Sequence, residues 1–165
     1  MYPSHNMRGR CLIKFTPENF PLYQIIQDMK LPGAEVVKQD FETARDGGDR
    51  EKYNFAMGLY TVAAAPGLSQ KIPAMTTAVL SGAQKQAYDI FEELAARDHA
   101  QAALMTSYMK ATGQGTPQDM QGAKTWLDRA EDLGGKNDFT QKLRKQITTV
   151  YLVVPAARKA AAGPA

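Results

Sequence analysis

The sequence contains few of the residues that small proteins use for metal binding or nucleophilic chemistry. It has one cysteine, Cys11, and two histidines, His5 and His99, in 165 residues. A single cysteine excludes an internal disulfide framework, and no orienting partner is evident for a Cys–His nucleophile pair. Neither histidine has a second ligand at HxxxH spacing. We therefore expect no metal, no cofactor and no enzymatic activity.

Long hydrophobic runs and blocks of like charge are also scarce. No window approaches the roughly 18 apolar residues of a membrane span, and the N-terminal region lacks the apolar core of a signal peptide. Lysine and arginine exceed aspartate and glutamate by only three, and the excess is spread along the chain. This is too little for a phosphate-binding block. We expect no membrane or nucleic-acid partner, and a cytoplasmic location.

What the sequence does have is helical periodicity. Its composition, 44% hydrophobic and 22% charged, is ordinary for a globular protein, and its length suits a single domain. From Ala34 onward, apolar residues recur at spacings of three and four, without convincing strand alternation. Six such stripes begin at Ala34, Tyr53, Ala87, Ala100, Ala123 and Phe139. The predicted fold class is all-α.

Short polar and glycine-containing breaks separate the predicted helices. We expect Gly47–Gly48 to end one helix in the left-handed conformation that glycine adopts cheaply. The side chains placed to cap the following helices are Asp49, Asp98, Thr116 (with Pro117 in the first turn), and Asn137 or Asp138. The connection over residues 66–82 is long for a helix–helix link. It is either an ordered excursion with a short helix of its own or a functional loop.

The domain limits follow from these patterns. Residues 32–153 form the predicted helical domain, and residues 154–165 form a low-complexity tail that we expect to be flexible. Residues 1–31 form an N-terminal extension, which either caps the helical domain or docks on a target protein. Its apolar side chains are Phe20, Leu22, Tyr23, Ile25, Ile26 and Met29.

An internal repeat is present. The positions of Ala56 and Tyr60 are matched 48 residues later by Leu104 and Tyr108. The region from Ala100 to Gly134 resembles a Sel-one-like repeat, a relative of the tetratricopeptide repeat. The motif residues are Ala100, Leu104, Tyr108, Gly113, Gly115, Asp119, Ala123, Trp126, Ala130 and Gly134. Met105 departs from the motif, because it stands where the family usually has glycine, and the interval from Tyr108 to Gly113 is two residues longer than usual.

The resemblance covers roughly residues 34–135 and implies a short, right-handed α-solenoid of antiparallel helix hairpins, with about two full repeats. In this family Tyr60, Tyr108 and Trp126 correspond to residues that pack between helices and hold no ligand. Sel-one-like proteins commonly act as adaptors, in bacterial signalling and secretion and in eukaryotic membrane-protein quality control. The resemblance thus implies a protein–protein interaction scaffold.

The predicted partner is a peptide or helix of another protein, bound on the curved helical surface. The predicted contact residues are Asn54, Gln101 and Lys110 on the first helices of the repeats, and the insert from Gln70 to Thr77, including Lys71. The alternative function is a small regulator or inhibitor of a cellular enzyme that docks through the N-terminal extension. The oligomeric state is left open.

Other charged groups are interpreted as solvated surface. These are the acid pairs Glu92–Glu93 and Glu131–Asp132 and the basic patch of Lys142, Arg144 and Lys145 on the last helix.

Overall fold

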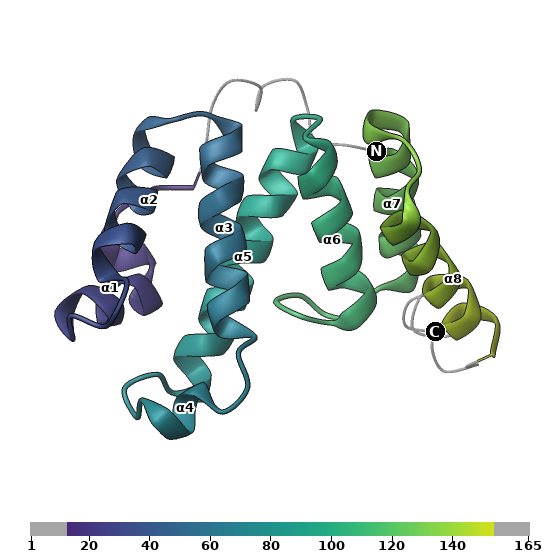
Figure 1. The fold of residues 1–165 in the computed structure, drawn as a ribbon. Helices are drawn as coiled ribbons and strands as arrows, with labels where there is room; N and C mark the ends of the chain where they lie inside the picture. The colour runs from purple at the N-terminus through teal and green to yellow at the C-terminus, as the bar shows by residue number, and fades with distance from the viewer. Residues whose placement is uncertain (1–12, 154–165) are drawn as a thin grey trace.

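The chain is all-α in the computed structural model, which describes residues 13–153 (Figure 1). No strand occurs within that range, so the predicted fold class is confirmed. A short 3-10 helix, η2 (Pro17–Asn19), is followed by the helices α1 (Pro21–Asp28), α2 (Ala34–Asp46), α3 (Asp49–Ala63), α4 (Leu68–Lys71), α5 (Thr77–Ala96), α6 (Ala100–Thr112), α7 (Met120–Gly134) and α8 (Asp138–Val153). No helix in the described range is both long and apolar enough to cross a bilayer.

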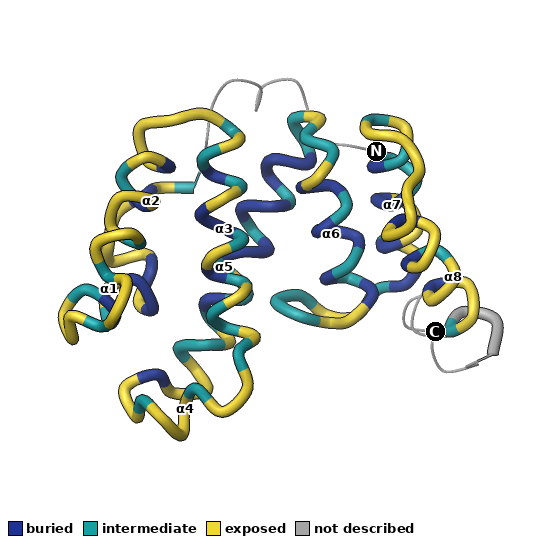
Figure 2. The backbone as a smooth tube through the Cα atoms, viewed as in Figure 1, coloured by how far each residue is buried: buried dark blue, intermediate teal, exposed yellow. Residues whose placement is uncertain are grey.

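Each long helix packs mainly on its neighbours in the chain. The pairs are α2 with α3, α3 with α5, α5 with α6, α6 with α7 and α7 with α8, and successive helices run in alternating directions (Figure 1). Helix α1 packs on α2 and α5. Helices α5 and α6 are therefore the most enclosed, whereas α2 and α8 expose one side along their length (Figure 2).

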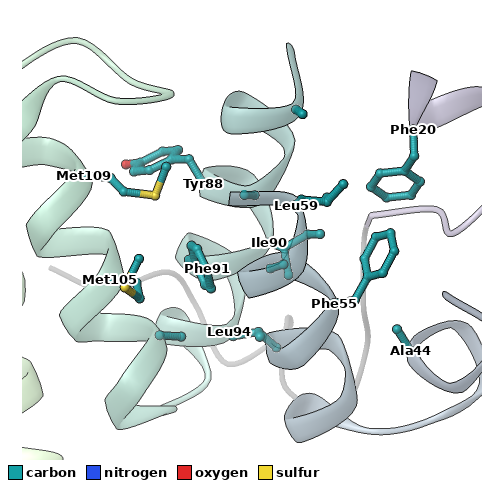
Figure 3. Close-up of a cluster of buried hydrophobic side chains, with 14 of the residues drawn as sticks. Phe20, Ala44, Phe55, Leu59, Tyr88, Ile90, Phe91, Leu94, Met105 and Met109 are labelled. Carbon is teal, nitrogen blue, oxygen red and sulfur yellow. The ribbon is translucent and has the colours of Figure 1, made fainter. Parts of the chain in front are cut away.

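Aromatic rings fill the core at the N-terminal end. Tyr23 of α1 stacks on Phe41 of α2, with ring centroids 4.3 Å apart. Phe20 meets Phe55 of α3 edge-on, with ring centroids 5.3 Å apart (Figure 3). Phe15 lies 5.7 Å from Phe55 and belongs to the same cluster. Edge-to-face and offset pairs of this kind add to the free energy gained by burying the rings. Most of the apolar set of the extension is thus buried here, and Met29 stays exposed.

Small residues line the junction of α6 and α7. Ala102, Ala103 and Ala123 are fully buried, and the Ser107 hydroxyl donates a hydrogen bond of 2.6 Å to the Ala123 carbonyl. A side-chain hydroxyl can reach the backbone of the next helix only when the two helices approach closely, which the alanines allow. Trp126 of α7 is 9% exposed, as expected for a packing residue.

The long connection is ordered and has a helix of its own, the first of the two alternatives. Helix α4 forms within it, and Met75 then inserts into the core at 2% exposure. The Thr76 hydroxyl accepts a hydrogen bond from the Val79 amide, so α5 begins at Thr77, well before its predicted apolar stripe.

Two predictions at the α2–α3 turn were wrong. Gly47 and Gly48 both have φ of −97° and are extended, so the predicted left-handed stop does not form. A Cβ at Gly47 would lie 2.5 Å from the Thr43 carbonyl oxygen. Glycine is needed at this position because there is no space for a side chain. Asp49 does not cap α3. Glu51 reaches back to the Gly48 amide, in the manner of a capping box, and Asp49 instead pairs with Arg97.

Two further caps were assigned to the wrong residue. Helix α6 is capped by His99, whose Nδ1 accepts from the Ala102 amide at 3.1 Å, while Asp98 adopts φ of +69° and pairs with Arg129. Helix α7 begins at Met120, capped by Asp119 rather than Thr116. Asn137 does cap α8, accepting from the Thr140 amide at 3.0 Å, as predicted.

Several charged residues predicted to be solvated have structural roles. Glu93 is buried at 7% exposure, and Glu92 accepts a hydrogen bond of 2.6 Å from the Tyr88 hydroxyl. Arg144 bridges to Asp128 and Glu131 of α7. These corrections share a cause, because helical spacing gives the direction of a side chain but not what the neighbouring helix brings opposite it.

Candidate functional site

The predicted contact residues do not form one surface. Gln70, Lys71 and Thr77 are exposed around α4 and the start of α5, and Gln101 is exposed in the first turn of α6. Helix α5 lies between these two groups, and its 20 residues span about 30 Å. Asn54 is exposed on α3, where it borders a small cavity of about 70 Å³ between α1, α2 and α3. The structure separates these residues rather than bringing them together.

Lys110 is engaged inside the fold. Its Nζ lies 3.8 Å from Asp119 Oδ2 and 5.7 Å from the centroid of the Tyr88 ring. The Tyr88 hydroxyl is in turn bonded to Glu92, and burial, followed by that bond, raises the pKa of Tyr88 well above its ordinary value. Lys110 therefore holds the segment before α7 against α5 and α6.

The same segment, residues 113–119, is fastened at several further points. The Tyr60 hydroxyl donates to Gln114 Oε1 at 2.7 Å, and the Asp119 amide donates to the Lys110 carbonyl at 2.8 Å. Gly115 has φ of +72°, and an added Cβ would lie 2.5 Å from the Gln84 carbonyl oxygen, so only glycine fits. These contacts fix residues 113–119 beside α6.

Beside this segment, Tyr60 of α3 lies next to Tyr108 of α6. Burial is the main reason that the pKa of Tyr60 is raised to about 12, and the neighbouring Tyr108 phenol raises it further. Tyr108 in turn packs against Phe139 of α8, with ring centroids 6.0 Å apart and ring planes tilted by 54°. Three rings from three helices thus follow one another along one side of the molecule.

A hollow of about 530 Å³ opens between α6 and α8 at the end of this row. We call it the α6–α8 groove. Its lining residues are Tyr108, Phe139, Lys142, Leu143, Lys145, Gln146, Thr149 and Val150. This volume is within the range of pockets that hold small ligands or anchoring side chains. The groove therefore offers a mainly apolar wall that the chain leaves open.

Phe139 corrects a sequence prediction. Its place in the apolar stripe of the last helix predicted burial, but its side chain is 48% exposed. Leu143 and Ile147, four and eight residues later, carry the packing of α8 at 2% and 3% exposure. Phe139 lies to one side of that stripe, in line with Lys142 and Gln146, because three and seven residues separate them on a helix.

The rim of the groove is basic. Lys142 and Lys145 are exposed on α8, and neither forms an ion pair within residues 13–153. Arg144 lies between them in sequence but turns to α7. Burial alone would lower the pKa of Arg144, but its hydrogen bonds to Asp128 and Glu131 raise it above its ordinary value. Arg144 thus pairs with Asp128 and Glu131 of α7, and Lys142 and Lys145 take no part in these ion pairs.

The metal-ligating side chains of the described residues are dispersed. Within residues 13–153, no three histidine, cysteine or carboxylate side chains gather to hold a metal. The His99 ring stacks on Tyr53 at 5.0 Å and uses Nδ1 for its cap, and burial, followed by the charge of Arg97, lowers its pKa. Cys11 and His5 lie outside the described residues, as does the predicted tail.

No known protein family, curated protein or solved structure matches this chain. The helical periodicity did not predict the groove, because it places Tyr108 and Phe139 in the core. The available signal was the spacing of Phe139, Lys142 and Gln146, which places a ring and a cation on one helix face.

Proposed function

We propose that this protein is a scaffold or adaptor that binds a peptide or helix of a partner protein. The observation that carries the proposal is the α6–α8 groove, with its exposed ring, Phe139, and its partly buried ring, Tyr108. Aromatic side chains in a concave site are the usual anchors of protein interfaces, because they bury a large area with few rotatable bonds. Phe139 leaves about half of its side chain in water, and a bound partner would remove that cost.

The proposal includes a short, right-handed α-solenoid of Sel-one-like repeats. Its support is the position of Tyr60 and Tyr108, which are 48 residues apart, lie on α3 and α6, and are neighbours in space. The alternating directions and sequential packing of the long helices also suit stacked hairpins. In this arrangement α3, α6 and α8 are equivalent first helices, and the rings of α6 and α8, Tyr108 and Phe139, line the groove that a partner would occupy.

The N-terminal extension is proposed to act as a cap rather than as a docking segment. Phe20 and Leu22 are each 1% exposed, so their apolar area already serves the fold. In this proposal the protein has no enzymatic activity and acts in the cytoplasm. Its effect on a partner arises from holding it, and the contact surface is a single groove rather than the dispersed residues Asn54, Gln101, Gln70, Lys71 and Thr77.

A capture experiment with matched variants tests this function. The full chain is immobilised and exposed to native lysate, together with Phe139→Ser and Val36→Ser, and the retained proteins are quantified by mass spectrometry. Val36 is a matched control because it is also apolar and 65% exposed, but it lies on α2 at the other end of the molecule. We expect a partner that is retained by the wild type and by Val36→Ser and is lost from Phe139→Ser. A partner retained equally by all three would refute the groove as its site.

A further inference from the structure

We propose that the occupant of the α6–α8 groove is an acidic segment of another protein with one large apolar anchor. This inference rests on the proposed function and specifies the partner chemistry. The anchor would lie in the hollow against the rings of Tyr108 and Phe139, and at least two carboxylates would face Lys142 and Lys145. The aromatic wall of the groove would therefore bind an apolar side chain, and its basic rim would bind carboxylates.

Charge complementarity is the first reason. Within the described residues, Lys85, Lys110, Lys124 and Arg144 pair with acidic side chains, whereas Lys14, Lys30, Lys38, Lys71 and Lys136 form no ion pair and line no apolar hollow. Lys142 and Lys145 have no acidic partner there either, but they do lie on the rim of an apolar hollow. A ligand carboxylate brought to this rim would gain attraction without displacing an existing ion pair, and partial enclosure by the groove would limit screening by salt.

The chain's own segments are poor candidates for this occupant. Residues 1–12 carry Arg8 and Arg10, and residues 154–165 carry Arg158 and Lys159, with no acidic residue in either segment. Either one would place further positive charge against Lys142 and Lys145. A second copy could offer Met29 or Val36, the other exposed large apolar residues of the described range, and each has a lysine close in sequence, Lys30 or Lys38. An acidic segment from a different protein fits both walls better.

The dimensions of the groove set the size of the ligand. Phe139 and Val150 mark its ends along α8, and the helical rise places them about 17 Å apart. An extended strand covers that length in about five residues and a helix in about eleven. Lys142 and Lys145 are three residues apart on one helix face, so the ligand carboxylates would lie about one helical turn apart.

Four labelled peptides of about ten residues test the inference, in titrations of the full chain followed by fluorescence anisotropy. The first has a central phenylalanine flanked by glutamate and aspartate. The second replaces the acids with glutamine and asparagine, the third replaces them with lysine, and the fourth keeps the acids but has serine in place of phenylalanine. We expect the first to bind at least about tenfold more tightly than each of the others.

Charge reversal of the rim supplies the decisive comparison. Lys142→Glu with Lys145→Glu should weaken binding of the acidic peptide by about 25-fold, roughly fivefold per lysine, and should strengthen binding of the lysine peptide. Lys14→Glu with Lys38→Glu is the matched control, because both lysines are exposed at the N-terminal end and the net charge changes equally. This control should change the affinity by less than about twofold.

The outcomes separate the two proposals. Equal, Phe139-dependent binding of the acidic and neutral peptides would overturn the acidic ligand and leave the groove as a binding site. Failure of every peptide to saturate below about 1 mM would count against both. Equal weakening by the rim and control variants would show long-range attraction only and would overturn the inference. Concentration-dependent self-association in sedimentation, abolished by the rim variant, would assign the groove to a second copy and overturn it as well.

Discussion

The two ends of the molecule hold their helices together in different ways. At the N-terminal end, five rings form one aromatic cluster: those of Phe15 and Phe20, which flank η2, and one each from α1, α2 and α3. At the C-terminal end, α6 and α7 meet through alanines and through the hydroxyl of Ser107. The first junction is filled by rings, whereas the second combines small residues with aliphatic side chains such as Leu127.

This difference bears on where the protein can bind a partner. The rings of the aromatic cluster pack against one another, so Phe20 and Phe41 are almost completely buried and cannot contact a partner. The C-terminal end has a smaller core beneath α8, and two of its rings, Tyr108 and Phe139, remain at the edge of a hollow. A close-packed pair of helices leaves little space for rings inside, and the rings that remain are available outside. Function, in our proposal, lies at the end that is packed with small residues.

The largest expected effect is the loss of a ring from the N-terminal cluster. Phe20→Ala should lower the free energy of unfolding by about 3–5 kcal/mol, because it removes a 1% exposed ring that touches several others. Phe139→Ala is the same substitution at a half-exposed position and should cost less than about 1 kcal/mol. Urea unfolding monitored by circular dichroism measures both. Similar losses for the two variants would contradict the distinction between the ends.

The opposite substitution should damage the other end. Ala123→Leu adds three carbons at a fully buried position between α6 and α7, and we expect a loss of about 1–3 kcal/mol from overpacking. Ala78→Leu, at an exposed position on α5, is the control and should change stability by less than about 0.5 kcal/mol. The measurement is again denaturant unfolding. If Ala123→Leu is tolerated as well as the control, the α6–α7 junction does not depend on small residues.

A smaller loss is expected from the hydroxyl that joins α6 to α7. Ser107→Ala removes the hydrogen bond to the Ala123 carbonyl and should cost about 1 kcal/mol, with little change in packing volume. Ser69→Ala, on exposed α4, provides the comparison and should be close to neutral. Thermal unfolding by calorimetry resolves a difference of this size. An unchanged midpoint for Ser107→Ala would show that the approach of the helices rests on the alanines alone.

The smallest effect concerns pH at the junction between the two ends. His99 caps α6 with a neutral Nδ1, and burial, followed by the charge of Arg97, lowers its pKa in the folded state. The stability that this histidine contributes is therefore complete above its unfolded pKa of about 6.5 and is lost as the pH falls from there toward the folded value. The full contribution should be about 1 kcal/mol or less, as for other caps.

His99→Asn separates this effect from other titrations, because asparagine can cap the helix and does not ionise. The free energy of unfolding is measured for both proteins between about pH 5 and pH 8. We expect the wild type to lose stability relative to the variant on acidification. A constant difference across the range would mean that protonation of His99 leaves the cap intact.

The sequence predicted the helices well where periodicity alone decides the structure. The stripes at Ala123 and Ala130 lie on the buried face of α7, and the glycines at 113 and 135 end their helices with positive φ. Local patterns are sufficient in these cases because the 3.6-residue period and the conformational freedom of glycine are properties of a few neighbouring residues.

The remaining features depend on residues that are distant in sequence. Asp49 and Asp98 look like helix caps, but Arg97, just after α5, and Arg129 of α7 pair with them, and other groups cap the helices. Thr116 was displaced as a cap because the segment before α7 is bonded to α3 and α6. The exposure of Phe139 depends on what the neighbouring helices bring opposite it, which no local pattern contains. The groove could therefore not be derived from the sequence alone.

The buried indole of Trp126 has a practical consequence. It is the only tryptophan in the chain, and although α7 belongs to the C-terminal end, this side chain packs into the larger core that also holds the aromatic cluster. Its emission spectrum is thus an intrinsic optical probe at the boundary of the two packing regimes. If its fluorescence transition and the loss of helicity do not coincide, the two ends do not unfold as one cooperative unit.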